Sequence, residues 1–285
     1  MDTDSQHIRI GHSPDPDDAF MFYALTTGVL DTPGREYEHV LLDIQTLNEK
    51  ALNKEYEISA VSIHSFPKII ENYALMNCGA SMGEGYGPML IANQEFTVDE
   101  ARSKTIAIPG LDTSAYLALR LAWGDVNVEV VPFDEILPSV VAGRFDVGLI
   151  IHEGQLTWKD EGVYLIQDMG VLWNEKTGLP LPLGGNVVRR DLGEDLCKML
   201  SDDVKRSIKH SIENPDLALE FAKKWGRGID DDTNREFVQM YVNDRTLDYG
   251  ESGRKAVRLF LSEGQKIGMV DPNLDTDGIE FIGAE

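Results

Sequence analysis

One histidine at the end of an apolar strand pattern is well placed for acid–base chemistry. His152 follows the apolar run 147–151 and precedes Glu153. Ligands of open α/β sheets bind beyond the carboxyl ends of the strands, so this position favours contact with a ligand. A neutral imidazole there can accept a proton near neutral pH. A histidine that is simply hydrogen-bonded at a strand end gives the same pattern. His12 and His64 also follow strand patterns and could face a ligand.

Two predicted helix starts could hold the anionic group of a ligand. Backbone N–H groups are free at the N-terminus of a helix, and its positive end attracts a carboxylate or a phosphate. Capping by the local side chains accounts equally well for the pattern at Thr113, and a simple cap or turn serine is the favoured explanation at Ser62. If both starts bind, they hold two ends of one ligand. The residues concerned are Ala60, Val61 and Ser62 in one segment, and Thr113, Ser114 and Ala115 in the other.

Acidic residues are concentrated near the start of the chain. His12, Asp15, Asp17 and Asp18 lie within seven positions, a combination that can bind a divalent metal. Their spacing lacks the glycine and the distal glutamate of a calcium loop. A helix cap at Asp17 or Asp18 is the simpler explanation. We therefore predict no metal.

Several common catalytic motifs are missing from the sequence. No Gly-x-Ser-x-Gly elbow of a serine hydrolase occurs. The glycine-rich stretch 83–87 lacks the Gly-Lys-Ser/Thr ending of a phosphate-binding loop and precedes a strand pattern. It therefore predicts a turn where the backbone passes close to the cleft or to the neighbouring lobe. Cys78 and Cys197 lie far apart without a CxxC spacing, which argues against a zinc site or a disulfide framework.

Composition limits the classes of protein and of partner. A length of 285 residues, at about 150 residues per domain, predicts two lobes or one large α/β unit. The formal net charge of −23 opposes binding to nucleic acid and to anionic lipid. No uncharged apolar run reaches the length of about 18 residues needed for a membrane span. The acidic start does not resemble a secretion signal, so we expect a cytoplasmic protein without membrane insertion. The sequence carries no signal for the oligomeric state.

Strand and helix patterns alternate up to about residue 190. This alternation predicts an α/β fold with parallel strands and crossover helices. Asp17 and Asp18 are expected to cap the first helix. The predicted strands cover residues 7–12, 39–44, 56–63, 86–93, 105–109, 126–131, 146–152 and 164–169. The predicted helices cover residues 19–25, 46–53, 66–73, 113–123 and 134–142.

The last third of the chain is predicted to be helical. Amphipathic patterns cover residues 194–212, 215–225, 232–242 and 250–267, and residues 271–285 are rich in acids, which predicts a solvated terminus. The simplest arrangement has a discontinuous lobe I of residues 1–95 plus 187–285. Lobe II, residues 96–186, is inserted into it, and the chain crosses near 93–97 and 178–184. Two such lobes would enclose a ligand cleft.

Five motifs in register resemble the 1,4-dihydroxy-6-naphthoate synthase family of menaquinone biosynthesis by the futalosine route. The resemblance implies a two-lobed, type II periplasmic-binding-protein-like fold used as a cytoplasmic enzyme without a cofactor. It also implies conversion of cyclic dehypoxanthinylfutalosine, a small carboxylate, into 1,4-dihydroxy-6-naphthoate with release of a dihydroxyacetone fragment. The motifs are Ser13-Pro-Asp-Pro-Asp-Asp-Ala-Phe20, Thr46-Leu-Asn48, Gly148-Leu-Ile-Ile-His-Glu153, Thr177-Gly-Leu-Pro-Leu-Pro-Leu-Gly184 and Tyr241-Val-Asn243.

The resemblance assigns roles to individual residues. The proton acceptor of the family falls on His152, which would start a carbon–carbon cleavage of the lyase type. The predicted substrate-binding residues are Asn48, Ala60, Val61, Ser62, Thr113, Ser114 and Ala115.

The sequence also departs from the family pattern. The family usually has Cys, Asn and Thr where this chain has Asp15, Asp17 and Ala19. Ser114 replaces a common threonine, and Asp112 replaces a bulkier polar residue. These changes leave a different substrate open. Chorismate dehydratase of the same pathway and a solute-binding protein of a transporter are the alternative functions, and turnover distinguishes an enzyme from a binding protein.

Overall fold

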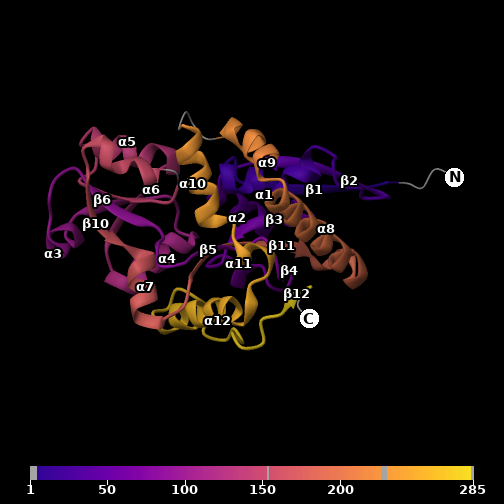
Figure 1. Cartoon of the computed structure of the whole chain (residues 1–285). Coiled ribbons are helices and arrows are strands. Elements are labelled where there is room, and N and C mark those ends of the chain that lie inside the picture. Colours follow the sequence, from indigo (N-terminus) through magenta and orange to yellow (C-terminus); the bar gives the residue numbers. More distant parts are fainter. Residues whose placement is uncertain (1–4, 153, 226–229, 284–285) are drawn as a thin grey trace. The chain divides into compact units, whose positions relative to one another are not determined.

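The chain forms two compact α/β units, each with its own β-sheet (Figure 1). The structure is a computed structural model that describes residues 5–152, 154–225 and 230–283. Unit 1 consists of Met1–Ser81, Gly184–Glu251 and Asp277–Glu285, and unit 2 of Met82–Leu183 and Ser252–Thr276. No helix among the described residues has both the length and the apolarity that crossing a bilayer requires.

The sheet of unit 1 has the strand order β12-β4-β11-β3-β1-β2, and β5 also pairs with β11. The pairs β1–β2, β1–β3 and β4–β12 are parallel, whereas β11 runs antiparallel to β3 and β4. The strands of this sheet are β1 (Gln6–His12), β2 (Arg35–Leu41), β3 (Ile58–Ser62), β4 (Tyr73–Met76), β5 (Ser81–Gly83), β11 (Leu181–Arg189) and β12 (Phe281–Ile282).

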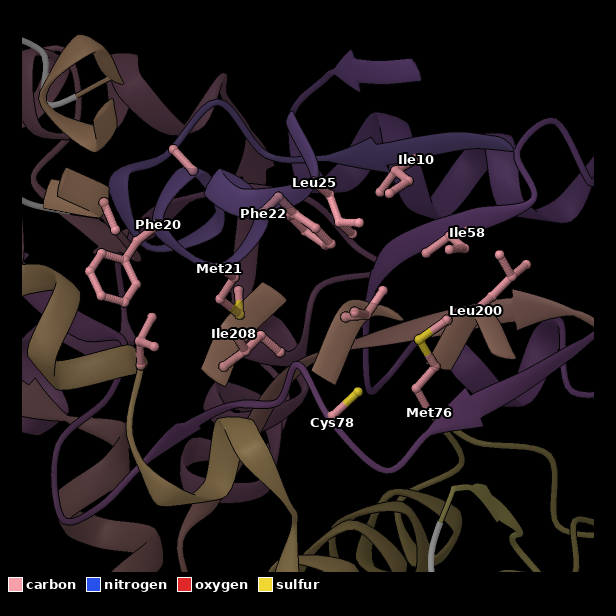
Figure 2. Packing of buried hydrophobic residues seen from close by; sticks show 14 of the residues in the cluster. Ile10, Phe20, Met21, Phe22, Leu25, Ile58, Met76, Cys78, Leu200 and Ile208 are labelled. Carbon is pink, nitrogen blue, oxygen red and sulfur yellow. The ribbon is translucent and has the colours of Figure 1, made fainter. Parts of the chain in front are cut away.

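Helices cover this sheet and close its core. The apolar side chains of α1 pack with those of α8, and Phe22, Leu25 and Ile208 are members of one buried cluster (Figure 2). Pro16 at the first position suits the start of α1, because its missing N–H has no partner to lose there. The helices of unit 1 are α1 (Pro16–Thr26), α2 (Ile44–Leu52), α8 (Glu194–Glu213), α9 (Pro215–Ala222), α10 (Asp231–Tyr241) and α11 (Asp244–Leu247).

Unit 2 contains a mixed sheet with the order β10-β6-β9-β7-β8. The strand β7 is parallel to β8 and β9, and β6 is antiparallel to β9 and β10. The strands are β6 (Met89–Ala92), β7 (Thr105–Ile108), β8 (Asn127–Val130), β9 (Val147–Ile150) and β10 (Tyr164–Asp168). The helices are α3 (Val98–Arg102), α4 (Ser114–Trp123), α5 (Ile136–Val141), α6 (Gly154–Thr157), α7 (Met169–Thr177) and most of α12 (Gly250–Lys266).

Three local predictions were wrong. The helix expected over 66–73 is only a 3-10 turn, Phe66–Lys68, because the chain enters the fully buried strand β4 at Tyr73. The first helix begins after Asp15, so Asp17 and Asp18 lie in its first turn and do not cap it. The C-terminal segment is not fully solvated. Ile279 and Phe281 are buried two residues apart, as in a strand with one face inward, and β12 pairs with β4.

The division into units also differs from the expected lobes, 1–95 plus 187–285 and 96–186, in two segments. Residues 82–95 belong to unit 2, because β6 pairs with β9 and β10. Most of α12 belongs there too. The ring of Phe260 packs edge-on against Trp173, with ring centroids 5.4 Å apart, and Gly264 lies against the side chain of Leu117. A helix pattern alone does not show which sheet the helix covers.

A buried carboxylate connects β2 with α8 in unit 1. Asp203, whose side chain is 1% exposed, accepts hydrogen bonds from Arg35 Nε at 2.6 Å and from Tyr37 Oη at 2.5 Å. Arg206 donates to it as well, at 3.0 Å. Burial and this carboxylate raise the pKa of Tyr37, so its hydroxyl stays protonated and remains a donor. The network satisfies a charge that would otherwise be costly to bury.

We expect Asp203→Ala to lower the free energy of unfolding by about 3–5 kcal/mol, because the substitution leaves the Arg35 guanidinium and the Tyr37 hydroxyl without their shared acceptor. Urea titration followed by circular dichroism measures the loss. The control is Glu194→Gln, which removes an exposed ion pair with Lys198 and should change stability by less than about 1 kcal/mol. Equal effects of the two substitutions would contradict a role for the buried network.

Candidate functional site

The imidazole of His152 is held by the backbone on both sides of its ring. The residue follows β9 and is 7% exposed. Its Nδ1 lies 3.0 Å from the N–H of Gly154, and its Nε2 lies 3.1 Å from the carbonyl oxygen of Phe133. An N–H only donates and a carbonyl oxygen only accepts, so Nδ1 carries the lone pair and Nε2 carries the hydrogen. The geometry therefore selects one neutral tautomer.

The turn that follows His152 fits tightly around the ring. A Cβ atom on Gly154 would lie 2.8 Å from His152 Cε1, so only glycine fits there without a shift. The backbone N–H of Gln155 donates to the carbonyl oxygen of His152 at 2.8 Å. The Gln155 side chain, 2% exposed, donates to the carbonyl oxygen of Gly87 at 2.5 Å. Gln155 thus connects the histidine turn to the glycine-rich stretch.

That glycine-rich stretch passes close to the start of α7. A Cβ atom on Gly87 would lie 2.9 Å from the backbone nitrogen of Gly170, and a Cβ atom on Gly170 would overlap the carbonyl oxygen of Tyr86. Asp168 caps α7 by accepting from the N–H groups of Gly170 and Val171. Burial raises the pKa of Asp168. Residues 86–87 therefore make close backbone contacts with the start of α7, within unit 2, and these contacts support the segment that Gln155 binds.

Both ring nitrogens of His152 have a backbone partner in this arrangement. A general base needs a lone pair that can reach the proton to be abstracted. The Nδ1 lone pair points at the N–H of Gly154. Proton transfer to Nδ1 therefore requires that this hydrogen bond be released, because a protonated Nδ1 and the Gly154 N–H would be two donors facing each other.

Ser62 is held by Asn48 in unit 1. The backbone N–H of Ser62 donates to Asn48 Oδ1 at 2.8 Å, and Asn48 Nδ2 donates to Ser62 Oγ at 3.1 Å. The N–H that we expected to bind an anion is thus engaged by a side chain. Ala60 and Val61 precede it within β3 and pair with Asn186 and Gly185 of β11. Since residues 66–68 form only a 3-10 turn, Ser62 does not open a helix, and that part of the prediction was wrong.

At the start of α4 the structure shows a capped helix. The Thr113 hydroxyl accepts from the N–H of Tyr116 at 3.2 Å and donates to the carbonyl oxygen of Gly110 at 2.8 Å. The Ser114 hydroxyl donates to the carbonyl oxygen of Leu183 at 2.5 Å. The capping interpretation therefore holds for Thr113. The only hydroxyl hydrogen of Ser114 is thus donated, so toward any other partner its oxygen acts as an acceptor.

The predicted site residues fall into two groups. Asn48 and Ser62 contact each other in unit 1, with Ala60 and Val61 next to Ser62 in β3. Unit 2 holds His152 and the helix start Thr113, Ser114 and Ala115. Sequence reasoning missed Gly154, Gln155 and Phe133, which position the imidazole. A glycine directly after the His-Glu pair was the one local signal for them.

The acidic cluster in the first motif is arranged around Ser13. The Ser13 hydroxyl donates to Asp15 at 2.5 Å, and the Ser13 N–H donates to Asp18 at 2.6 Å. Burial raises the pKa of Asp18 well above its usual range, and the neighbouring Asp17 adds to this. Within the described ranges, no group of three or more His, Cys, Asp or Glu side chains is placed to hold a metal ion.

The buried His12 and the half-buried His39 form a pair near the ends of β1 and β2. His12 Nε2 lies 3.1 Å from His39 Nδ1, and the ring of His12 stacks on Phe22 with centroids 4.7 Å apart. Desolvation lowers the pKa of His12 to about 3, with a further contribution from His39, and lowers the pKa of His39 to about 4. Both rings are therefore neutral near pH 7. Their packing gives them a structural role in unit 1.

Comparisons with known proteins agree over nearly the whole chain. The sequence profile of a family described as menaquinone biosynthesis matches residues 8–266. A protein of Thermus thermophilus named 1,4-dihydroxy-6-naphthoate synthase is 38% identical over 267 residues, which is 93% of this chain and 97% of the relative. A protein of Streptomyces coelicolor with the same name is 33% identical over 281 residues, which is 96% of this chain and 98% of the relative.

Solved structures extend the similarity to the fold. A protein of Archaeoglobus fulgidus has a TM-score of 0.89 at 43% identity, covering 93% of this chain and 98% of its own. The ligand-binding component of an ABC-type import system from Staphylococcus aureus has a TM-score of 0.71 at 13% identity, covering 97% of each chain. The second likeness concerns the fold alone. It confirms the predicted two-lobed, periplasmic-binding-protein-like architecture.

We expect Gly154→Ala to lower the free energy of unfolding by about 1–3 kcal/mol, because the added methyl group would overlap the His152 ring. In a His152→Ala background the ring is gone, and the same substitution should cost less than about 0.5 kcal/mol, since alanine is the better helix former. Thermal and urea unfolding of the four proteins measures this coupling. If Gly154→Ala lowers the free energy of unfolding equally in both backgrounds, the His152 ring is not what requires glycine at position 154.

We also expect stability to fall in acid because of the histidine pair. Unfolding restores the ordinary pKa of about 6.5 to His12, so below that pH the unfolded state binds a proton that the folded state takes up only near pH 3. The contribution of His12 to the free energy of unfolding is therefore complete above pH 6.5, and it decreases as the pH falls toward 3. Between pH 7.5 and 5, wild type should lose about 2 kcal/mol more than His12→Gln. If the free energies of unfolding of the two proteins fall in parallel with pH, the lowered pKa assigned to His12 is contradicted.

Proposed function

This chain belongs to the menaquinone-biosynthesis family, and on that premise we propose that it is an enzyme that forms 1,4-dihydroxy-6-naphthoate. The observation that carries the proposal is the identity of 38% and 33%, over nearly the full length, with two relatives that bear the name of this synthase. The substrate we propose is cyclic dehypoxanthinylfutalosine. Its cleavage would release a dihydroxyacetone fragment, which makes the reaction a carbon–carbon lyase reaction.

His152 is the proposed general base. Its neutral tautomer, with the lone pair on Nδ1, has the protonation state that proton abstraction requires. We infer that substrate binding releases Nδ1 from the N–H of Gly154, so that the lone pair becomes available. Removal of the substrate proton would then start a retro-aldol-like cleavage. Formation of an aromatic naphthalene ring provides the driving force.

Polar groups at the end of β3 and at the start of α4 are proposed to bind the substrate. The Ser62 hydroxyl would donate to an acceptor of the substrate, because its oxygen already accepts from Asn48. Ser114 would accept from a substrate hydroxyl, because its own hydrogen is donated to Leu183. The N–H groups at the start of α4 suit a second oxygen. Thr113 supports this helix start as its cap.

The proposal is tested by incubating the purified protein with cyclic dehypoxanthinylfutalosine and identifying the product by mass spectrometry. We expect the naphthoate from wild type, and a turnover number lower by about 10²- to 10⁴-fold in His152→Ala. The matched control is His7→Ala, which removes an exposed imidazole at the start of β1 and should leave turnover unchanged.

Other outcomes would select a different function. Dehydration of chorismate, without formation of the naphthoate, would identify the alternative enzyme of the same pathway. Tight binding of a small carboxylate without turnover of either compound would indicate a solute-binding protein. Near-normal turnover in His152→Ala would remove the base assignment but not the synthase assignment.

A further inference from the structure

We propose that Asn48 is a positioning residue that fixes the Ser62 hydroxyl as a hydrogen-bond donor for a carboxylate oxygen of the substrate. The inference rests on the proposed function, because that function supplies the carboxylate. It gives Asn48 a role that is exerted through Ser62, in place of direct contact with the ligand.

The backbone of Ser62 determines the orientation of the Asn48 amide. The Ser62 N–H can only donate, so the amide atom 2.8 Å away must be the oxygen Oδ1. The opposite orientation would place the NH₂ group against the N–H, with two buried donors facing each other. Such an arrangement leaves both donors unsatisfied. The orientation of the amide therefore follows from the chain itself.

The orientation of the amide in turn determines the direction of the Ser62 hydroxyl. With Oδ1 on the backbone N–H, Nδ2 lies 3.1 Å from Ser62 Oγ and donates to it. The hydroxyl oxygen is then an acceptor toward Asn48, and its single hydrogen remains to be donated elsewhere. Among the described residues the structure gives this hydrogen no acceptor. An ionised carboxylate has only acceptor oxygens, so it matches what Ser62 can offer.

The helix that carries Asn48 is firmly placed. Asp43 caps α2 by accepting from the N–H of Thr46 at 3.0 Å, and it accepts from the Thr46 hydroxyl at 2.5 Å. Leu47 and Asn48 have no exposed surface, and Leu47 packs in a cluster with Tyr56. A fully buried side chain on a packed helix holds its partner in one geometry. This rigidity is what a positioning role requires.

Ser114 provides a contrast with the same functional group. Its hydroxyl hydrogen goes to the carbonyl oxygen of Leu183, so it can accept from a ligand but cannot donate to one. The two serines therefore suit different parts of a ligand, Ser62 an acceptor oxygen and Ser114 a hydroxyl group. Of these two hydroxyls, only that of Ser62 can serve as a donor to a carboxylate.

The test reverses the direction of the Ser62 hydroxyl without changing its position. In Asn48→Asp, one carboxylate oxygen still accepts from the Ser62 N–H, while the other accepts the hydroxyl hydrogen that wild type offers to the substrate. We expect KM to rise about 10- to 100-fold at pH 8, with kcat changed less than about threefold. Gln45→Glu, which adds the same charge to the same helix, is the control and should leave both constants unchanged.

A double-mutant cycle separates positioning from direct contact. Ser62→Ala should raise KM by a similar factor in wild type, but by less than about threefold in the Asn48→Asp background, because the donor is already lost. If Asn48 bound the substrate itself, the two increases would multiply, and the proposal would be overturned. Lowering the pH toward 6 protonates part of the introduced carboxylate, which can then donate to Ser62 Oγ. The KM of Asn48→Asp relative to wild type should therefore fall, while that of Ser62→Ala should not.

A binding measurement keeps this test independent of the proposed reaction. Calorimetric titration with 1,4-dihydroxy-6-naphthoate gives Kd for the same four proteins without any turnover. If the double variant binds about as weakly as each single variant, the result supports the role of Asn48. This holds even if wild type does not convert the substrate, in which case only the proposed reaction fails. If the increases in Kd of the two single variants multiply in the double variant, or if Ser62→Ala leaves Kd unchanged, the inference is overturned even if wild type is an active synthase.

Discussion

Backbone N–H and carbonyl groups determine what each polar side chain of the candidate site can still offer a ligand. One N–H sets the amide of Asn48 and, through it, the hydroxyl of Ser62. Another N–H and one carbonyl oxygen select the tautomer of His152. The carbonyl oxygen of Leu183 takes the hydrogen of Ser114. Because backbone groups cannot exchange donor for acceptor, these assignments follow from the fold and do not depend on side-chain rotation.

Local signals account for the parts of the fold that the sequence predicted. The strand before His152 and the helix after Thr113 were both expected, since an apolar run and a capping residue act over only a few positions. The helix expected after Ser62 is absent among the described residues, because the buried strand β4 follows too closely for a helix to form. The strand β12 and the location of α12 depend on distant partners, which a sequence pattern does not show.

The sequence indicated the residue types of the candidate site but not its hydrogen-bond directions. Motif resemblance selected His152, Ser62 and Ser114, whereas the partners that define their roles are spread along the chain. Ser114 donates to a residue 69 positions away, and the Gln155 amide reaches a carbonyl 68 positions away. A residue list therefore treats two serines as equivalent, although the structure makes one a donor and the other an acceptor.

Under the proposed function, this directionality would let so acidic a chain bind an acid. With 49 acidic and 26 basic residues, the overall field repels a carboxylate. Salt screens that field beyond about 8 Å, so recognition depends on the groups that touch the ligand. The hydroxyl of Ser62 is neutral, and its hydrogen is directed away from Asn48 by a buried amide. A donor oriented in this way needs little reorganisation on binding, and in the proposed function it would donate to the carboxylate directly.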